Sequence, residues 1–218
     1  MKKIVMNRPA FLFCLLAVVA MGCAKTKTDY YPNGSVMSVR HFSGRKLQGI
    51  SVWFYENGAK QQEVSYRHDK PEGLTTRWFA NGNKQSEEMY REGKKNGKSV
   101  MWDENGNKVE ERNYRNDTLN GQYSFWYSTG MVKVTGNFSK GLYDGKWEYF
   151  SETGVKVGEG NYEKGSGILT GFLPNGKKIR VVHYKNNLKH GDELIFNEDG
   201  TIKDTITYRF GKVVKTAE

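Results

Sequence analysis

The sequence predicts an all-β protein in which tandem 24-residue β-hairpin repeats form an elongated, twisted antiparallel meander. The first observation behind this prediction is a periodic turn glycine, found at Gly34, Gly58, Gly82, Gly106, Gly130, Gly154, Gly176 and Gly200. An aromatic residue lies four positions before each of these glycines, and another lies eight positions after it. No segment sustains apolar residues at helical spacing. A fixed period of this length is typical of repeat architectures.

The N-terminal segment 1–22 has the composition of a secretory signal. Three basic residues precede the apolar run 11–21, which is too short to span a bilayer. Cys23 follows Ala-Met-Gly, an arrangement that resembles the lipobox of bacterial lipoproteins, in which the cysteine is acylated after cleavage. We therefore expect Cys23 to be lipidated; the alternative is an ordinary secretory signal with an incidental cysteine. Ala24 in the second position of the processed chain favours the outer membrane over the inner one.

Cysteine content and charge limit the kinds of site that the processed chain can hold. The full sequence has two cysteines, Cys14, inside the signal, and Cys23. The processed chain therefore keeps only Cys23 and can form no intramolecular disulfide and no thiolate metal site. We expect no metal and no cofactor. The net charge of +10 falls to +7 without the three basic signal residues, which is compatible with anionic lipid, acidic glycans or an acidic protein. Lysine and arginine are scattered, as on a solvated surface, and export argues against a nucleic-acid partner.

Four segments follow from this pattern. After the signal we expect an anchor and polar tether over 23–29, about eight hairpin repeats over 30–212 and a C-terminal tail over 213–218. No linker rich in proline or serine separates the copies. One gap between turn glycines, from Gly154 to Gly176, is 22 residues instead of 24. We place this deletion in a loop between hairpins, where it leaves the alternation of strand faces intact.

Each copy is expected to be one hairpin. In the copy around Gly106, the strand-like runs 98–103 and 108–114 flank Asn105-Gly106. Asn-Gly favours the positive φ angles of tight hairpin turns, so we place the tight turns at this dipeptide. The polar segments between hairpins, such as 91–97, are expected to be the longer loops.

Hairpins of this size cannot bury a core alone, so neighbouring copies must stack. One face is expected to carry an aromatic column, mainly as core and, in the alternative interpretation, as a binding face. Its members are Phe54, Trp78, Trp102, Trp126, Phe150, Phe172 and Phe196. The opposite face takes the apolar residues Trp53, Met101, Phe125, Tyr149 and Ile195, which favours a sheet that curls on itself or carries a partner groove.

Charged residues also recur with the repeat. The return strands carry a glutamate column and begin with a lysine column: Glu63, Glu87, Glu111 and Glu159, with Lys60, Lys84, Lys108 and Lys156. Ladders of this kind usually form solvated edges that keep a sheet soluble. A charged groove for a polymer is the alternative.

The order of Gly, then Trp/Phe-x-x-Asn-Gly, then Lys and Tyr resembles the variant MORN-repeat family. It is especially similar to bacterial YwqK-type proteins, which are assigned as antitoxin components of toxin–antitoxin modules. Segments 78–82 and 102–106 carry the resemblance most clearly, and it extends over 30–212. The resemblance implies an elongated hairpin array that scaffolds protein contacts or approaches membrane lipids, without shared catalytic residues.

Motifs for catalysis are absent from the sequence. The four histidines lack the spacing of metal ligands, and there is no nucleophile elbow, P-loop or Rossmann fingerprint. We therefore predict an exported, lipid-anchored scaffold that binds a protein or an envelope component and is not an enzyme. An antitoxin-like or immunity-like protein that neutralises one toxin is the alternative, and an envelope glycan hydrolase is a less favoured one. Thr118, in Asp-Thr-Leu, resembles an O-glycosylation acceptor of exported proteins.

Overall fold

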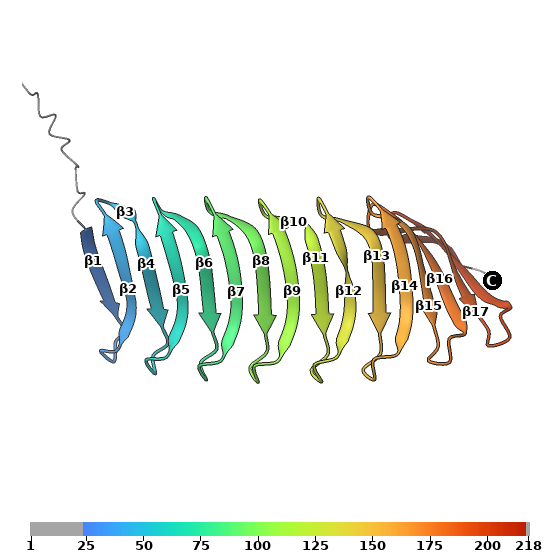
Figure 1. The fold of residues 1–218 in the computed structure, drawn as a ribbon, viewed down its shortest axis with the longest axis horizontal. Coiled ribbons are helices and arrows are strands. Elements are labelled where there is room, and N and C mark those ends of the chain that lie inside the picture. Colours follow the sequence, from blue (N-terminus) through green and yellow to red (C-terminus); the bar gives the residue numbers. More distant parts are fainter. Residues whose placement is uncertain (1–23, 217–218) are drawn as a thin grey trace, which may run out of the picture.

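The computed structural model describes residues 24–216, which form one open antiparallel sheet of 19 strands (Figure 1). Successive strands lie side by side in chain order, so the expected repeat meander is confirmed. The strands are β1 (Ala24–Tyr30), β2 (Val36–Ser43), β3 (Lys46–Leu47), β4 (Gly49–Phe54), β5 (Lys60–Arg67), β6 (Lys70–Trp78), β7 (Lys84–Arg91), β8 (Lys94–Trp102), β9 (Lys108–Arg115), β10 (Thr118–Leu119), β11 (Gly121–Trp126), β12 (Val132–Ser139), β13 (Leu142–Phe150), β14 (Lys156–Glu163), β15 (Ser166–Phe172), β16 (Lys178–Lys185), β17 (Leu188–Phe196), β18 (Ile202–Arg209) and β19 (Lys212–Thr216). None of the described residues forms a helix long and apolar enough to cross a membrane.

The sheet extends further toward both chain ends than the sequence suggests. Residues 24–29, expected as part of the anchor and tether, form β1 together with Tyr30 and pair with β2 from Ala24 opposite Ser43 onward. The expected tail contributes residues 213–216 to β19, which pairs with β18. Both short segments contain lysine and β-branched residues, and an adjacent strand supplies the pairing that composition alone does not reveal. Cys23 and the signal segment 1–22 lie outside the described residues.

The two kinds of connection are the reverse of the prediction. The tight turns are the polar segments between the expected hairpins: in the connection from β7 to β8, Glu92 and Gly93 have φ angles of 52° and 83°. The Asn-Gly connections span five residues, such as 103–107, in which Gly106 alone has a positive φ, of 86°. Asn-Gly is compatible with either geometry. We call the two edges of the sheet the tight-turn rim and the Asn-Gly rim.

Backbone hydrogen bonds connect neighbouring turns along the tight-turn rim. The N–H of Gly93 donates to the carbonyl of Pro71 at 2.9 Å, and the N–H of Asp117 donates to the carbonyl of Lys95 at 2.9 Å. The same bond recurs further along, from Gly141 to Leu119 at 2.8 Å. Each turn is thereby tied to the preceding copy, which fixes the spacing of the rim.

The two residues missing from the short copy come from a β-bulge and not from a loop. In a regular copy, the register of β7 and β8 shifts between Glu88 and Tyr90, and Gly97 has a φ of 114°. The register between β14 and β15 runs without a shift, and Gly167 is in ordinary strand conformation. The expectation that strand faces are preserved is confirmed, because Leu169 is buried like its equivalents in other copies.

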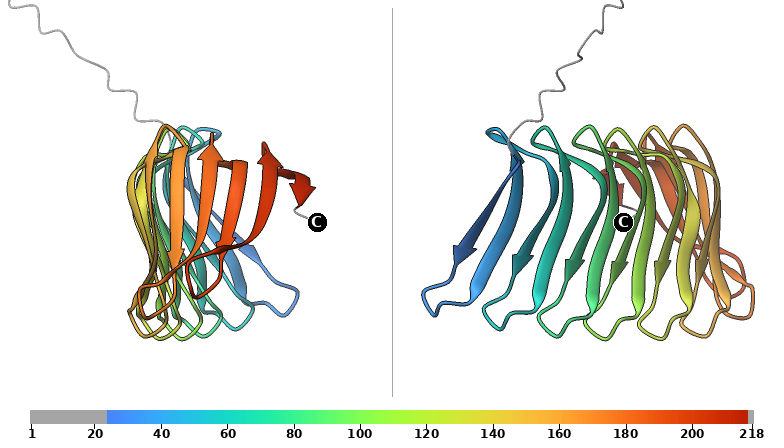
Figure 2. Two further views of the ribbon diagram at one scale, coloured as in Figure 1. Left: turned by 90° about the vertical axis from the view of Figure 1, so that its right-hand side faces the viewer. Right: turned by 60° about the vertical axis from the view of Figure 1, so that its left-hand side comes forward.

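The sheet bends at this short copy, so that β15–β19 turn out of the plane of β1–β12 (Figure 2). Loss of the bulge shortens the tight-turn rim at this position. The side chain of Asn187 spans the shortened region: its Nδ2 donates to the carbonyl of Gly141 at 2.9 Å, and its Oδ1 accepts the N–H of Tyr143 at 2.8 Å. Turns two copies apart therefore meet directly.

The two faces of the sheet differ in burial. One face, here called the tyrosine face, carries the aromatic residues eight positions after each turn glycine, such as Tyr90 and Tyr162. In the bend it contains the buried Trp147, Tyr162 and Val182, so it lines the inside of the bend. The other face, here called the lysine–glutamate face, carries the charged ladders and no fully buried aromatic ring among the described residues.

Candidate binding site in the bend of the sheet

The aromatic column expected as core lies on the lysine–glutamate face, and all seven of its rings are half-buried. The column is therefore not the core, although Val100, on the same face, is 8% exposed. Three lysines of the ladder, Lys60, Lys84 and Lys108, lie over the ring of the next copy. Lys84 Nζ is 5.9 Å from the Trp102 ring centroid and 2.5 Å from Glu87. Lys108 is 5.1 Å from the Trp126 ring. The column and the charged ladders therefore form one repeating, solvent-facing array.

The expected turn glycines serve backbone conformation rather than close packing. From Gly58 to Gly200, all seven have φ angles between 79° and 89°. At Gly106, a Cβ atom would meet nothing within 4 Å. The penalty for a side chain at these positions is thus conformational.

The true core is a row of directly opposed residues on the tyrosine face, which the sequence analysis did not identify. One member lies seven positions before the turn glycine and the other lies six positions after it. From Gly58 to Gly200, the pairs are Ser51–Val64, Thr75–Glu88, Ser99–Arg112, Tyr123–Gly136, Trp147–Gly160, Leu169–Val182 and Glu193–Ile206. A small residue opposes a large one in the first five of these pairs. This compensation of size was visible in the sequence as an anticorrelation between two repeat positions.

Two glycines in strand interiors make room for the largest rings. A Cβ atom on Gly136 would lie 2.1 Å from a ring carbon of Trp147, and one on Gly160 would lie 2.7 Å from the ring of Tyr162. Glycine within a strand often marks a place where another group approaches closely. Trp147, 2% exposed, therefore fits into the surface of the sheet itself.

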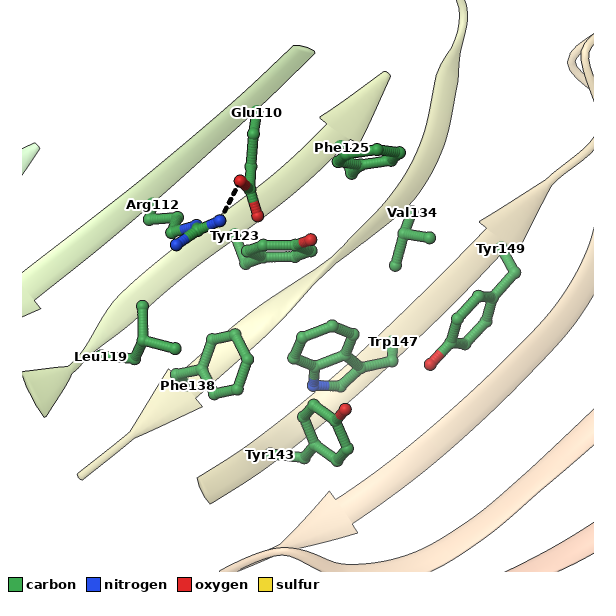
Figure 3. Close-up of a pocket in the computed structure, with 10 residues that line it drawn as sticks. All are labelled: Glu110, Arg112, Leu119, Tyr123, Phe125, Val134, Phe138, Tyr143, Trp147 and Tyr149. Carbon is green, nitrogen blue, oxygen red and sulfur yellow. Dashed lines mark hydrogen bonds and ion pairs between the residues drawn. The ribbon is translucent and has the colours of Figure 1, made fainter. Parts of the chain in front are cut away.

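The rings around Trp147 surround an open hollow of about 400 Å³. Tyr143 and Phe138 pack edge-on against Trp147, with centroids 4.6 and 5.0 Å away, and Tyr123 stacks on it at 5.6 Å. Figure 3 shows these side chains directed toward one another from neighbouring strands. The lining consists of Glu110, Arg112, Leu119, Tyr123, Phe125, Val134, Phe138, Tyr143, Trp147 and Tyr149.

One end of the hollow is polar. Glu110 is 8% exposed and forms an ion pair with Arg112 (Figure 3). The hydrogen bond to Glu110 raises the pKa of Arg112 above its usual range. The pKa of Tyr123 is raised as well, first by burial and then by the negative charge of Glu110. At neutral pH the site thus offers neutral phenols beside one charge-assisted pair.

Burial raises the pKa of Tyr149 from 10.0 to about 12. The unfolded chain therefore loses this proton first as the pH rises. The contribution of the neutral phenol to stability is complete below pH 10 and disappears as the pH approaches about 12. We expect Tyr149→Phe to reduce the loss of stability between pH 10 and about 12, measured as the urea unfolding midpoint at each pH. The same loss of stability in the variant and the parent would contradict the burial of the Tyr149 phenol.

The hollow has the properties of a recognition site. Its rings offer apolar contact area, and the Glu110–Arg112 pair provides an acceptor and a donor at one end. Pockets of this composition bind apolar groups and use a few polar atoms for orientation. Within residues 24–216, no group of three or more His, Cys, Asp or Glu side chains is placed to hold a metal ion.

A family model described as MORN repeat variant matches residues 47–68, 71–92, 95–116 and 143–164. No curated protein matches the chain. Two similar solved structures are "Crystal Structure of TcdB2-TccC3-Cdc42", 13% identical over 88% of this chain and 16% of that chain, and "Crystal Structure of TcdB2-TccC3 without hypervariable C-terminal region", 12% identical over 89% and 17%. The chain spans about a sixth of the length of those chains, and the TM-score of 0.19 in both cases supports no conclusion about fold or function.

Proposed function

This chain carries MORN-variant repeats, and from that premise we propose that it is a repeat scaffold that binds a protein partner in the bend of its sheet. The observation that supports this most strongly is the open aromatic hollow. Half-buried Tyr123, Phe125 and Phe138 line it and remain partly exposed to solvent. Apolar and aromatic side chains are the groups that such a hollow accommodates, and these residues are typical anchors of protein interfaces.

The partner is proposed to insert one apolar or aromatic side chain into the hollow. Its main chain or a nearby polar group would then reach the Glu110–Arg112 pair at the polar end. A buried anchor surrounded by a ring of less critical contacts is the usual arrangement at an interface hot spot. The regular repeats on either side of the bend would act as a rigid support.

A crosslinking pull-down from native envelope tests this site. We expect Phe125→Ala to reduce recovery of a dominant protein partner at least about tenfold, as for a truncated hot-spot residue. Met101→Ala is the matched control, because Met101 occupies the equivalent position one copy earlier, outside the hollow. Equal recovery by both variants, each confirmed as folded by circular dichroism, would contradict the proposal.

We further propose that the scaffold is exported and anchored in a membrane by lipid on Cys23, with the outer membrane favoured. The basic N-terminus, the short apolar run and the small residues before Cys23 support this proposal. The expected mature protein begins at Cys23 and carries acyl mass, whereas Cys23→Ala should leave the chain uncleaved or unanchored. An intact mass without acyl groups on the native protein would contradict it.

The same pull-down separates the remaining candidate partners. A dominant protein that is lost in the Phe125→Ala variant supports the scaffold. If that protein is an exported toxin whose effect the chain prevents, the neutralising function applies. Recovery of lipid or glycan without a protein partner would instead assign binding to the envelope itself.

A further inference from the structure

Positive charge is concentrated along one rim of the sheet. Each connection is counted here together with the last residue of the strand before it and the first residue of the strand after it. On this basis the tight-turn rim carries twelve Lys and Arg residues and four Asp and Glu residues. The Asn-Gly rim, counted in the same way, carries six of each. Scattered charges in the sequence thus become segregated by the fold, because basic residues recur on both sides of the tight turns.

Within residues 24–216, the basic residues in the flat part of this rim form no ion pair, unlike other lysines and arginines of these copies. Lys70, Arg91, Lys94 and Arg115 line a hollow of about 560 Å³ that also includes Glu92. Arg91 lies directly opposite Lys94 across the turn. Like charges in opposed positions destabilise a strand pair, so the folded sheet alone gives no reason for this arrangement.

Two of the four acidic residues of the same rim accept backbone N–H groups. Asp117 Oδ1 accepts the N–H of Lys95 at 2.7 Å, and Asp69 Oδ1 accepts the N–H of Leu47 at 2.6 Å. By contrast, the lysines that begin the return strands at the other rim have glutamate partners, as in Lys60–Glu63 at 2.8 Å. The excess positive charge of the tight-turn rim therefore remains available to an external anion.

The first described residue is located at this rim. Ala24 lies opposite Ser43, the last residue of β2 before its tight turn, so β1 starts at the basic rim and runs away from it (Figure 1). Ala24 is bonded directly to Cys23, and consecutive Cα atoms are about 3.8 Å apart. Since β1 occupies the segment expected as a tether, no length of chain separates an anchor at Cys23 from the rim.

We propose that the tight-turn rim lies against an anionic phospholipid surface, with the sheet standing on the membrane and its Asn-Gly rim directed away. This inference rests on the proposed lipid anchor at Cys23, which brings the rim to the bilayer surface. A basic patch beside an acylated residue adds electrostatic attraction to anionic lipid to the association that the acyl chains provide. Basic side chains near a surface rich in anionic lipid strengthen that association, and salt screens the effect.

The test uses the full lipidated protein in vesicles of phosphatidylcholine, with or without phosphatidylglycerol. One fluorophore is placed on the tight-turn rim through Thr118→Cys, and another on the Asn-Gly rim through Ser128→Cys. Quenching by a probe on lipid headgroups reports which rim lies at the surface. In anionic vesicles we expect several-fold stronger quenching at residue 118 than at residue 128, with the difference reduced by salt.

Two matched variants remove four charges each. K70Q/R91Q/K94Q/R115Q is expected to abolish the difference in quenching, whereas K60Q/K84Q/K108Q/K156Q, on the other rim, should retain it. Equal quenching at the two labels, or a difference that survives the first variant, would overturn the proposal. Binding of a soluble acidic protein or glycan by the rim, without such a difference, would overturn it too.

The anchor is tested separately by flotation with neutral vesicles. Flotation of both variants with phosphatidylcholine alone supports the lipid on Cys23, whatever the rim does. Flotation only with anionic vesicles, lost in K70Q/R91Q/K94Q/R115Q, would support the rim and contradict the anchor.

Discussion

Gly136→Ala is expected to destabilise the protein by about 3 kcal/mol, the upper part of the range for overpacking a filled site. The added methyl group would lie 2.1 Å from a ring carbon of Trp147. That ring cannot move aside freely, because Tyr143 and Phe138 hold it with centroids at 4.6 and 5.0 Å. The shift of the urea unfolding midpoint measures the effect.

Gly171→Ala is the matched control for this change. Gly171 is also inside a strand, but its added Cβ would meet its nearest neighbour, Arg180 Cβ, at 3.6 Å. We expect an effect of less than about 1 kcal/mol, since the substitution also restricts the unfolded chain. If the two variants unfold at the same urea concentration, Gly136 does not act as the recess for Trp147. Strong coupling between Gly136→Ala and Trp147→Ala would support the contact itself.

Trp147→Ala is expected to cost about 3–5 kcal/mol, as for a large ring removed from a packed site. Trp147 is 2% exposed, and its Nε1–H also donates to the carbonyl of Asn137 at 3.1 Å. Trp102→Ala should cost markedly less, because the Trp102 ring is half-buried on the lysine–glutamate face. Thermal unfolding of the two variants decides the order, and a larger loss for Trp102→Ala would contradict the assignment of the core.

The periodic glycines and aromatics were sufficient to predict the fold, because a fixed repeat restricts the chain to stacked identical units. They were insufficient to distinguish the two turns. Asn105-Gly106 is compatible with a two-residue turn or a five-residue connection, and the choice depends on strand register. Glu92-Gly93 was less recognisable as a tight turn, because glutamate rarely adopts positive φ, and its φ of 52° is held by the pairing of β7 with β8.

The candidate site was predictable only in part. The sequence placed Phe125 and Tyr149 on the face opposite the aromatic column and favoured a curled sheet or a groove there. The sequence did not single out Trp147. A repeat pattern identifies residues that recur at the same position in every copy, whereas this site consists of residues that differ from those at the same position in the other copies. The aromatic column recurs in every copy and is therefore a property of the array, not of a site.

The concentration of charge on one rim was not predictable from the scattered basic residues. Arg91 and Lys94 are close in sequence, but their relation to Lys70 and Arg115 depends on the tight turns of adjacent copies meeting at one edge. Placing those turns at Asn-Gly would have assigned the residues to longer loops. The expectation of a tether over 23–29 was wrong for a similar reason. Residues 24–29 form a strand because they pair with β2, and composition alone does not reveal that pairing.

Because opposed residues on paired strands complement each other in size, only some segments of such a repeat can be duplicated without separating the pairs. A recombination point inside an Asn-Gly connection could join the first strand of one copy to the return strand of another. Trp147 would then face Arg112 instead of Gly160, or Ser99 would face an empty position. A crossover within a tight turn keeps each pair together. The matched segments 47–68, 95–116 and 143–164 start just after one tight turn and end within the next, so the segment that can be duplicated without loss is the hairpin around Asn-Gly.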